Sequence, residues 1–122
     1  MRIWDLDPAL LCDRHLLGEH RELHAVWTVL TTDRAGYAHH PETLRWRGRL
    51  AALYRRHEEQ VAEMARRGFR HRSPLDPRLA TGQARQTVLV DSVEAQRERL
   101  AARGCGCPRD AARGATARRP GV

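Results

Sequence analysis

The sequence predicts an all-α fold, with one compact domain of about three helices, an extended N-terminal lead and a basic C-terminal tail. Apolar residues recur at intervals of three, four and seven, as they do on one face of a helix, and no segment alternates as a strand does. A chain of 122 residues fits a single domain. We expect this domain to span residues 1–104, and we expect residues 105–122, rich in Gly, Ala and Arg, to be disordered.

The first helix is expected to follow a short extended lead at residues 1–6. Asp7 and Pro8 indicate its start, because an Asp side chain caps free N–H groups and Pro fits the first helical position. The helical pattern continues to about Thr31, and a loop is expected at residues 33–37. The apolar face of this helix consists of Cys12, Leu16, Leu23, Trp27 and Leu30.

The second helix is expected to open at residues 39–42 (His-His-Pro-Glu) and to end at Gly68, where a left-handed cap is favoured. Its face toward the core consists of Trp46, Leu50, Leu53, His57, Val61 and Met64. Residues 69–90 contain several turn signals and are expected to be irregular. A third helix is expected from about Asp91 to Gly104. It passes through Ser92, Val93, Gln96 and Leu100.

The chain contains 22 Arg and no Lys, so the N-terminus is the one primary amine in the sequence. A codon bias toward Arg is an alternative reason for the missing Lys, but the chemical consequence is the same. With a net charge of +7, the chain suits phosphate partners, because guanidinium groups match phosphate oxygens. No apolar run is long enough to span a membrane, and the N-terminus lacks a signal-peptide core. We therefore expect a cytoplasmic protein with no membrane partner.

The cysteines and histidines are not expected to hold a metal. Three cysteines are an odd number for a disulfide framework, and Cys105-Gly-Cys107 lacks the two-residue spacer of zinc ribbons. His20 and His24 have the spacing of a zinc-binding helix, but no Glu directly follows His20. The residues that could complete such a site are His39, His40 and the two cysteines. A zinc-binding protein built on the histidines stays an alternative, while no metal and no cofactor are expected.

A charged face on the first helix carries the candidate chemistry. His15, Glu19 and Glu22 lie on one side of a helical projection, and Gly18 leaves room for a close approach. A carboxyl group that is half-buried beside apolar side chains tends toward a raised pKa and can act as a general acid or base. An α-amine, with a pKa of about 7.7–8.0 against about 10.4 for Lys, is a nucleophile near neutral pH. The alternative interpretation is a solvated patch of charges.

The segment His15-Leu-Leu-Gly-Glu-His-Arg-Glu-Leu23 resembles the signature of the pyrimidine-dimer DNA glycosylase family, which the phage endonuclease V typifies. The resemblance covers roughly residues 1–103 and is most specific in its first part. It continues through Arg66-Arg-Gly-Phe69 and, more weakly, through Glu98-Arg-Leu-Ala101. It implies an endonuclease V-like helical domain at residues 1–104 that acts on double-stranded DNA containing damaged bases.

The resemblance implies a bifunctional DNA glycosylase and AP lyase. The α-amine of Met1 would attack C1′ of a damaged nucleotide, a pyrimidine dimer being the family's substrate, form a Schiff base and nick the strand by β-elimination. The other catalytic residues are then Glu22 and His15. The residues expected to bind the substrate or the DNA are Arg2, Arg14, Arg21, Glu19, Arg66, Arg67 and Arg99.

Further arginines are candidates for the groove that holds bent DNA. They are Arg45, Arg47, Arg49, Arg55, Arg56, Arg66, Arg67, Arg70 and Arg72. Two departures leave the recognised lesion open: Ala25 stands where the phage signature has a second Arg, and the aromatic C-terminal tail of the phage protein is missing. We expect a monomer that associates with the nucleoid when it is bound to DNA. A non-catalytic basic DNA-binding module is the alternative to an enzyme.

Overall fold

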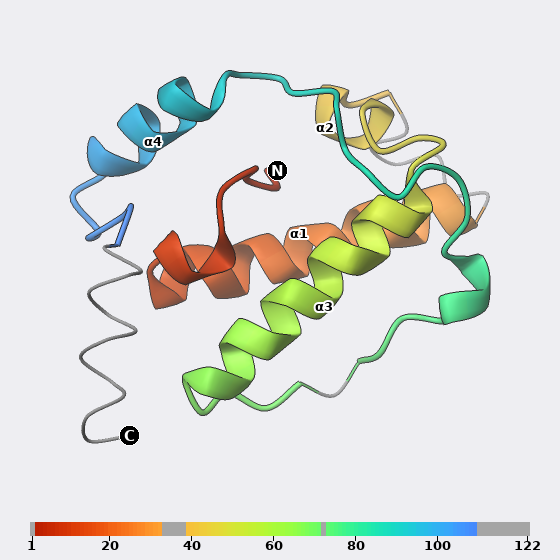
Figure 1. Cartoon of the computed structure of the whole chain (residues 1–122), viewed down its shortest axis with the longest axis horizontal. Helices are drawn as coiled ribbons and strands as arrows, with labels where there is room; N and C mark the ends of the chain where they lie inside the picture. The colour runs from red at the N-terminus through yellow and green to blue at the C-terminus, as the bar shows by residue number, and fades with distance from the viewer. Residues whose placement is uncertain (1, 33–38, 72, 110–122) are drawn as a thin grey trace.

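The computed structural model describes residues 2–32, 39–71 and 73–109, and it confirms the all-α class. The helices are α1 (Asp13–Thr31), α2 (Pro41–Leu44), α3 (Leu50–Arg66) and α4 (Val93–Ala101), with the 3-10 helices η1 (Pro8–Leu10) and η2 (Pro77–Leu79). These ranges contain no strand, and one antiparallel bridge joins Arg49 to Gly82. None of the described helices has the length and apolar composition that a membrane crossing needs. The N-terminal segment lies between α1 and α4, while α3 crosses α1 (Figure 1).

The start of the first helix differs from the prediction. Asp7 does cap a helix, because its Oδ1 accepts a hydrogen bond from the Ala9 N–H at 2.9 Å, but that helix is the short η1. The chain then extends at Leu11, which is fully buried, and Cys12 becomes the N-cap of α1. Burial of Leu11 thus interrupts the helix that the local signal starts. The predicted end at Thr31 is confirmed.

The predicted second helix is divided in two. α2 ends at Leu44 and α3 begins at Leu50, with Gly48 between them at φ +75°. Gly adopts this left-handed conformation without the steric cost of a side chain, and an α-helix cannot continue through it. The turn docks on a distant loop, where the Gln83 N–H donates to the Gly48 carbonyl at 2.9 Å. The prediction of one continuous helix was therefore wrong, although Trp46 is buried as its spacing predicts.

The apolar core has two parts that meet along the N-terminal lead. The first contains Ile3, Leu23, Val26, Trp27, Trp46, Ala52, Leu53 and Leu75. The second contains Trp4, Leu6, Leu11, Leu16, Met64, Leu100 and Cys107. Because Ile3 and Trp4 belong to different parts, the lead is packed into the domain on both of its sides. Hydrophobic burial therefore fixes the path of the chain immediately after its first residue.

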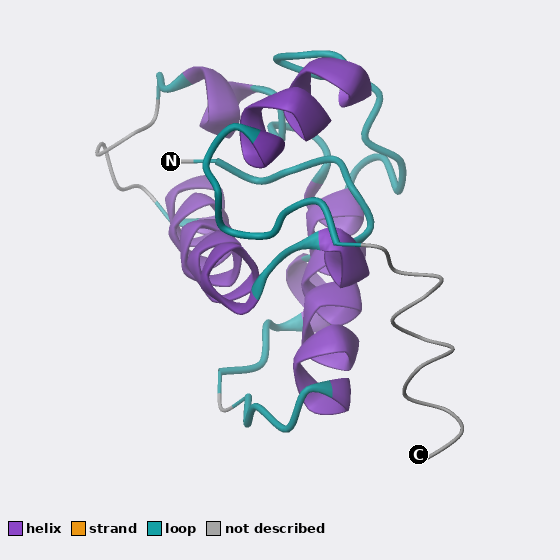
Figure 2. Cartoon of the chain, turned by 90° about the vertical axis from the view of Figure 1, so that its left-hand side faces the viewer, coloured by secondary structure: helices purple, strands orange, loops and turns teal. Residues whose placement is uncertain are grey.

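α4 begins where the sequence predicts. The Ser92 Oγ accepts a hydrogen bond from the Ala95 N–H at 3.1 Å, which is the expected N-cap contact. Gln96 and Leu100 are fully buried, whereas Val93 is 37% exposed. The helix therefore rests on the domain through Gln96 and Leu100, which lie about one turn apart on the same face. Figure 2 shows it above the N-terminal segment.

Residues 105–109 differ from the expected tail because they pack on the domain. Cys107 is buried, and the Arg109 N–H donates to the Leu10 carbonyl at 2.6 Å. This contact returns the chain to η1, near the start of α1. The rest of the predicted tail, residues 110–122, lies outside the described residues, as do residues 33–38, which contain the predicted loop.

Gly82→Ala is expected to destabilise the protein more than Gly68→Ala does. Both glycines have a positive φ, +82° and +86°, and an L-residue in the left-handed region costs about 1–2 kcal/mol. A Cβ on Gly82 would also lie 2.2 Å from the Gly48 carbonyl oxygen, whereas one on Gly68 meets nothing within 4 Å. Urea unfolding measures both free energies. Equal losses would contradict the docking of the two loops.

Candidate active site

The N-terminal lead is held by one buried carboxylate on α1. The Trp4 N–H donates to Glu19 Oε1 at 2.8 Å, and Arg56 binds both Glu19 oxygens at 2.8 and 3.0 Å. Gln60 donates to the same carboxylate. Arg56 also donates to the Leu6 carbonyl at 2.6 Å, so two points of the lead, Trp4 and Leu6, are tied to one ion pair. Burial opposes the charge of Arg56, but Glu19 outweighs it and raises the pKa of the guanidinium above its ordinary value.

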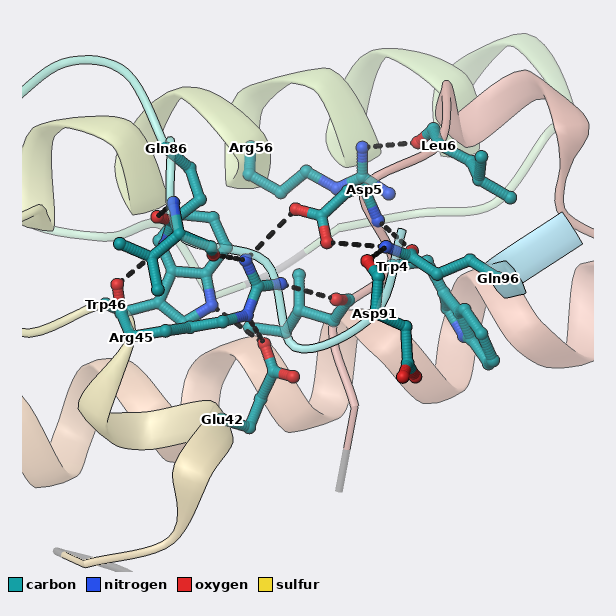
Figure 3. Close-up of polar contacts among 12 residues, drawn as sticks. Trp4, Asp5, Leu6, Glu42, Arg45, Trp46, Arg56, Gln86, Asp91 and Gln96 are labelled. Atoms are coloured by element: carbon teal, nitrogen blue, oxygen red, sulfur yellow. Dashed lines mark hydrogen bonds and ion pairs between the residues drawn. The ribbon is translucent and has the colours of Figure 1, made fainter. Parts of the chain in front are cut away.

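A second buried cation, Arg45, joins the lead to α2 and to the loop that contains Val88 (Figure 3). Its Nη2 donates to the Ile3 carbonyl at 2.7 Å, and its Nη1 lies 3.0 Å from Asp5 Oδ1. Nη1 also donates to the Val88 carbonyl at 2.9 Å, and Nε donates to Glu42 at 2.6 Å. A guanidinium group has five N–H donors in a fixed fork, and this one uses them on neighbours from α2 and from two loops. Arg45 therefore sets the lead against the rest of the domain.

α4 is aligned with the lead by a pair of side-chain contacts, also visible in Figure 3. The Asp5 N–H donates to Gln96 Oε1 at 2.7 Å, and Gln96 Nε2 donates back to Asp5 Oδ2 at 3.0 Å. Gln96 Nε2 also lies 3.0 Å from the Asp91 carbonyl. Because Gln96 is fully buried, each of its polar atoms needs such a partner.

These contacts shape a cavity of about 250 Å³ beside the first described residue of the lead. Its lining consists of Arg2, Trp4, Arg14, His15, Gly18, Glu19, Glu22 and Arg103. The structure therefore brings together most of the residues that the sequence singles out around the N-terminus. A Cβ on Gly18 would meet nothing within 4 Å, so this position is open, as predicted. Met1 itself lies outside the described residues.

Cations surround the mouth of this cavity. Arg2 pairs with Asp91 at 3.0 Å and lies over the Trp4 ring, with its Cζ 4.5 Å from the ring centroid. The Cζ of Arg103 lies 5.9 Å from the same centroid. Arg14 is exposed on α1. Arg103 follows the end of α4, and no motif or spacing in the sequence marks it as a neighbour of the first helix.

One ring nitrogen of His15, the histidine that lines the cavity, faces three cysteine sulfurs. His15 Nδ1 lies 3.2 Å from the Cys12 sulfur, 3.3 Å from that of Cys105 and 3.4 Å from that of Cys107. Burial, followed by the charges of nearby arginines, lowers the pKa of His15 below its ordinary value. The imidazole is therefore neutral near pH 7.

Several predicted DNA-binding residues have internal partners instead. The carboxylate of Glu19 is buried in the network described above, and Arg45 and Arg56 are buried with it. Arg67 has a side chain that is 7% exposed, because it binds Glu63 at 2.7 Å and the Leu11 carbonyl at 2.7 Å. The arginines that remain exposed on α1, α3 and α4 include Arg14, Arg21, Arg55, Arg66 and Arg99. Arg72 lies outside the described residues.

Among the described residues, two clusters offer complete sets of metal ligands. The first is Cys12, His15, Cys105 and Cys107, and the second is His20, His24, His57 and His71. Within each cluster, one ligand atom per residue lies within 4.8 Å of all the others. Sequence spacing marked the pair His20 and His24 but neither complete set, because each set joins residues from segments that are far apart in the chain.

Comparison with known proteins identifies one family. A family model described as pyrimidine dimer DNA glycosylase matches residues 1–77, which is more than half of the 122 residues. The matched part contains the lead, α1, α2 and α3, and it ends before α4. No curated protein and no solved structure matches the chain.

Glu19→Gln is expected to destabilise the protein by about 3–5 kcal/mol, because it leaves Arg56 buried without its counter-charge. Chemical unfolding followed by circular dichroism measures this loss. The matched control is Arg78→Gln, which breaks the exposed pair with Asp76 and should leave the unfolding midpoint unchanged. A Glu19→Gln protein as stable as the control would contradict the role of Glu19 as anchor of the lead.

Proposed function

Because the chain belongs to the pyrimidine dimer DNA glycosylase family, we propose that it repairs DNA as a bifunctional glycosylase and AP lyase whose nucleophile is the α-amine of Met1. The observation that carries the proposal is the cavity at the start of the lead, where Glu22 and Gly18 of α1 share a wall with Arg2. The family supplies the class of substrate, DNA with pyrimidine dimers. The residues that line the cavity support the proposed reaction.

In the proposed reaction, the unprotonated α-amine attacks C1′ of the damaged nucleotide. A bond forms between nitrogen and C1′, the glycosidic bond breaks, and the base leaves with the electron pair. Loss of the amine proton and opening of the sugar ring give a Schiff base. Removal of a C2′ proton then expels the 3′ phosphate and nicks the strand. Each proton transfer needs a group that can act as acid and base at the sugar.

Glu22 is the residue that we assign to these proton transfers. It is half-buried and lines the cavity together with Arg2 and Trp4 of the lead. The cations Arg2, Arg14 and Arg103 around the mouth favour the neutral form of a nearby amine, which is the nucleophilic form. We assign His15 to the wall of the cavity, because its Nδ1 faces three sulfurs.

Binding of double-stranded DNA is assigned to the arginines that line this cavity, Arg2, Arg14 and Arg103, and to the exposed Arg21 of α1. Arg14 and Arg21 lie a heptad apart on α1, and Arg103 follows α4 on the other side of the lead. Together with Arg2 they can neutralise phosphates on both sides of a nucleotide that is flipped toward the cavity. In this proposal Glu19 positions the lead and makes no contact with DNA.

Borohydride trapping tests the nucleophile. We expect reduction of the enzyme with DNA containing an abasic site to give a covalent adduct, and peptide mapping should place it on the N-terminal residue. The chain has no Lys to compete for the sugar. Acetylation of the α-amine is expected to abolish the adduct. An adduct of unchanged yield after acetylation, or no adduct in either sample, would overturn the amine mechanism.

Glu22→Gln tests the acid–base assignment. We expect strand cleavage at a pyrimidine dimer to fall by about 10²–10⁴-fold, because the amide cannot transfer the protons. Affinity for the damaged duplex, measured by fluorescence anisotropy, should stay close to that of the unchanged protein. Glu94→Gln, on the exposed first turn of α4, is the control for loss of a negative charge. Normal cleavage by Glu22→Gln would refute the assignment.

A further inference from the structure

The two clusters of cysteine and histidine side chains are not explained by the proposed reaction. In each of them, ligand atoms from distant parts of the chain converge on one point. The first cluster joins the start of α1 to the segment after α4, and the second joins α1, α3 and the loop after α3. Of these eight side chains, Cys107 and His57 are buried and the others are half-buried, so both centres are largely shielded from solvent.

The cysteine cluster has the dimensions of a zinc site. The three distances from His15 Nδ1 to sulfur are 3.2, 3.3 and 3.4 Å. Around a tetrahedral Zn²⁺ ion, with bonds of about 2.3 Å to sulfur and about 2.0–2.1 Å to nitrogen, the sulfur–nitrogen separation is about 3.5 Å. All four atoms also lie within 4.8 Å of one another, so the sulfurs are grouped around the same point.

Hydrogen bonds among the four residues do not satisfy this arrangement. An imidazole Nδ1 carries either one proton or one lone pair, so it can serve one of the three sulfurs at a time, while the Cys105 sulfur also lies 4.0 Å from the Leu100 carbonyl oxygen. A cation at the centre binds all four groups at once. The Cys12 N–H points at the Cys107 sulfur from 2.9 Å, and such a backbone donor stabilises a thiolate.

The surrounding charge also favours bound thiolates. Three thiolates and one Zn²⁺ ion have a net charge of −1. The cavity beside the sulfurs is lined by Arg66, Arg67 and Arg109 and by one carboxylate, Asp13, which pairs with Arg67. The lining keeps a net positive charge, which complements such a centre. The backbone turns sharply around Cys105, because Gly104 and Gly106 on either side of it take positive φ values of +68° and +96°. These turns bring the Cys105 and Cys107 sulfurs toward the same point.

We propose that Cys12, His15, Cys105 and Cys107 bind a structural Zn²⁺ ion. A set of three cysteines and one histidine fills all four positions of the ion and leaves none for substrate. The ion ties the N-terminus of α1 to the segment that follows α4, and so it holds Arg103 beside the cavity at the lead. This inference does not depend on the reaction proposed above.

A different set of contacts supports a metal site in the histidine cluster. The Nε2 atoms of His20 and His24 are 3.2 Å apart, as are those of His24 and His57 and those of His57 and His71. Four nitrogens on a tetrahedral ion, with bonds of about 2.0–2.1 Å, are separated by about 3.3–3.4 Å. The four rings therefore have the spacing of ligands to a single ion.

The partners of the outer ring nitrogens fix which inner nitrogens carry lone pairs. Gln60 Oε1 accepts from His20 Nδ1 at 2.8 Å, and the Glu58 carboxylate accepts from His57 Nδ1 at 2.8 Å. Their Nε2 atoms are then unprotonated and aimed at the cluster. His24 Nε2 lies against both and has one proton at most. The Nε2 protons of His24 and His71 can serve the lone pairs of His20 and His57 two by two, whereas a cation at the centre would bind all four nitrogens at one point.

The geometry points to a second divalent metal ion, bound by His20, His24, His57 and His71. Imidazole suits Zn²⁺ and its first-row neighbours, and the Gln60 and Glu58 contacts are those that orient metal-bound histidines. Gln60 also donates to Glu19, which holds the Trp4 N–H. The ion is thereby joined through three side chains to the lead.

Metal analysis of the full chain purified in the presence of zinc tests both sites. We expect two equivalents of Zn²⁺ per chain in the unchanged protein, one in Cys105→Ser, one in His71→Ala, and none in the double variant. His39→Ala, which changes an exposed histidine outside both clusters, is the control and should retain two. Two equivalents in Cys105→Ser would overturn the cysteine site, and two in His71→Ala would overturn the histidine site.

Cobalt substitution gives a readout that does not depend on any variant folding. We expect the Co²⁺-loaded, unchanged protein to show a thiolate-to-cobalt charge-transfer band, with its three thiols protected from a thiol reagent until chelator is added. Absence of the band, or full thiol reactivity with metal present, would refute the cysteine site. A single equivalent of tetrahedral Co²⁺ that carries the thiolate band would refute the histidine site alone. Both outcomes are independent of DNA cleavage.

Discussion

The buried carboxylate of Glu19 is the constraint on which the arrangement of the site depends. It lies in the middle of α1, accepts the Trp4 N–H and pairs with Arg56 of α3. A carboxylate in this position must be paired, because an isolated charge in the core would be strongly unfavourable. The polar contacts that satisfy it therefore dictate how the two long helices cross and where the lead runs between them. The shape of the cavity beside the lead is therefore a consequence of how this buried carboxylate is paired in the core.

The buried polar side of α3 explains why a small apolar core still fixes a single packing arrangement of the helices. Arg56, His57, Gln60 and Glu63 recur at helical spacing and are all buried, so part of the helix packs through hydrogen bonds. Hydrophobic contacts tolerate sliding, whereas a network of directed donors and acceptors fits one register. This helix therefore contributes orientation as much as stability. Glu63 shows the same principle, because its two arginine partners overcome its burial and lower its pKa.

Periodicity and capping signals predicted the helical class, the end of α1 and the start of α4. They failed at Leu11 and Gly48, where tertiary contacts break a helix that the local pattern would continue. The candidate site was predictable as far as it lies on one helix face, as Glu22 does. Arg103 was not, because its place depends on how α4 folds back over the lead. Arg45 was not predictable as a buried residue, since nothing local distinguishes a guanidinium that will meet distant carboxylates from one on the surface.

The hydrogen bonds between Gln96 and Asp5 make α4 part of the structural unit that holds the N-terminal lead. The family model matches residues 1–77, yet Gln96, which binds Asp5 of the lead, lies beyond the matched part. A fragment trimmed to the region of similarity would keep α1 and α3 but would leave Asp5 and Trp4 uncovered on one side. The minimal autonomous unit is thus defined by what the first six residues need in order to stay folded. Residues of α4 are therefore needed to keep the N-terminal lead in place.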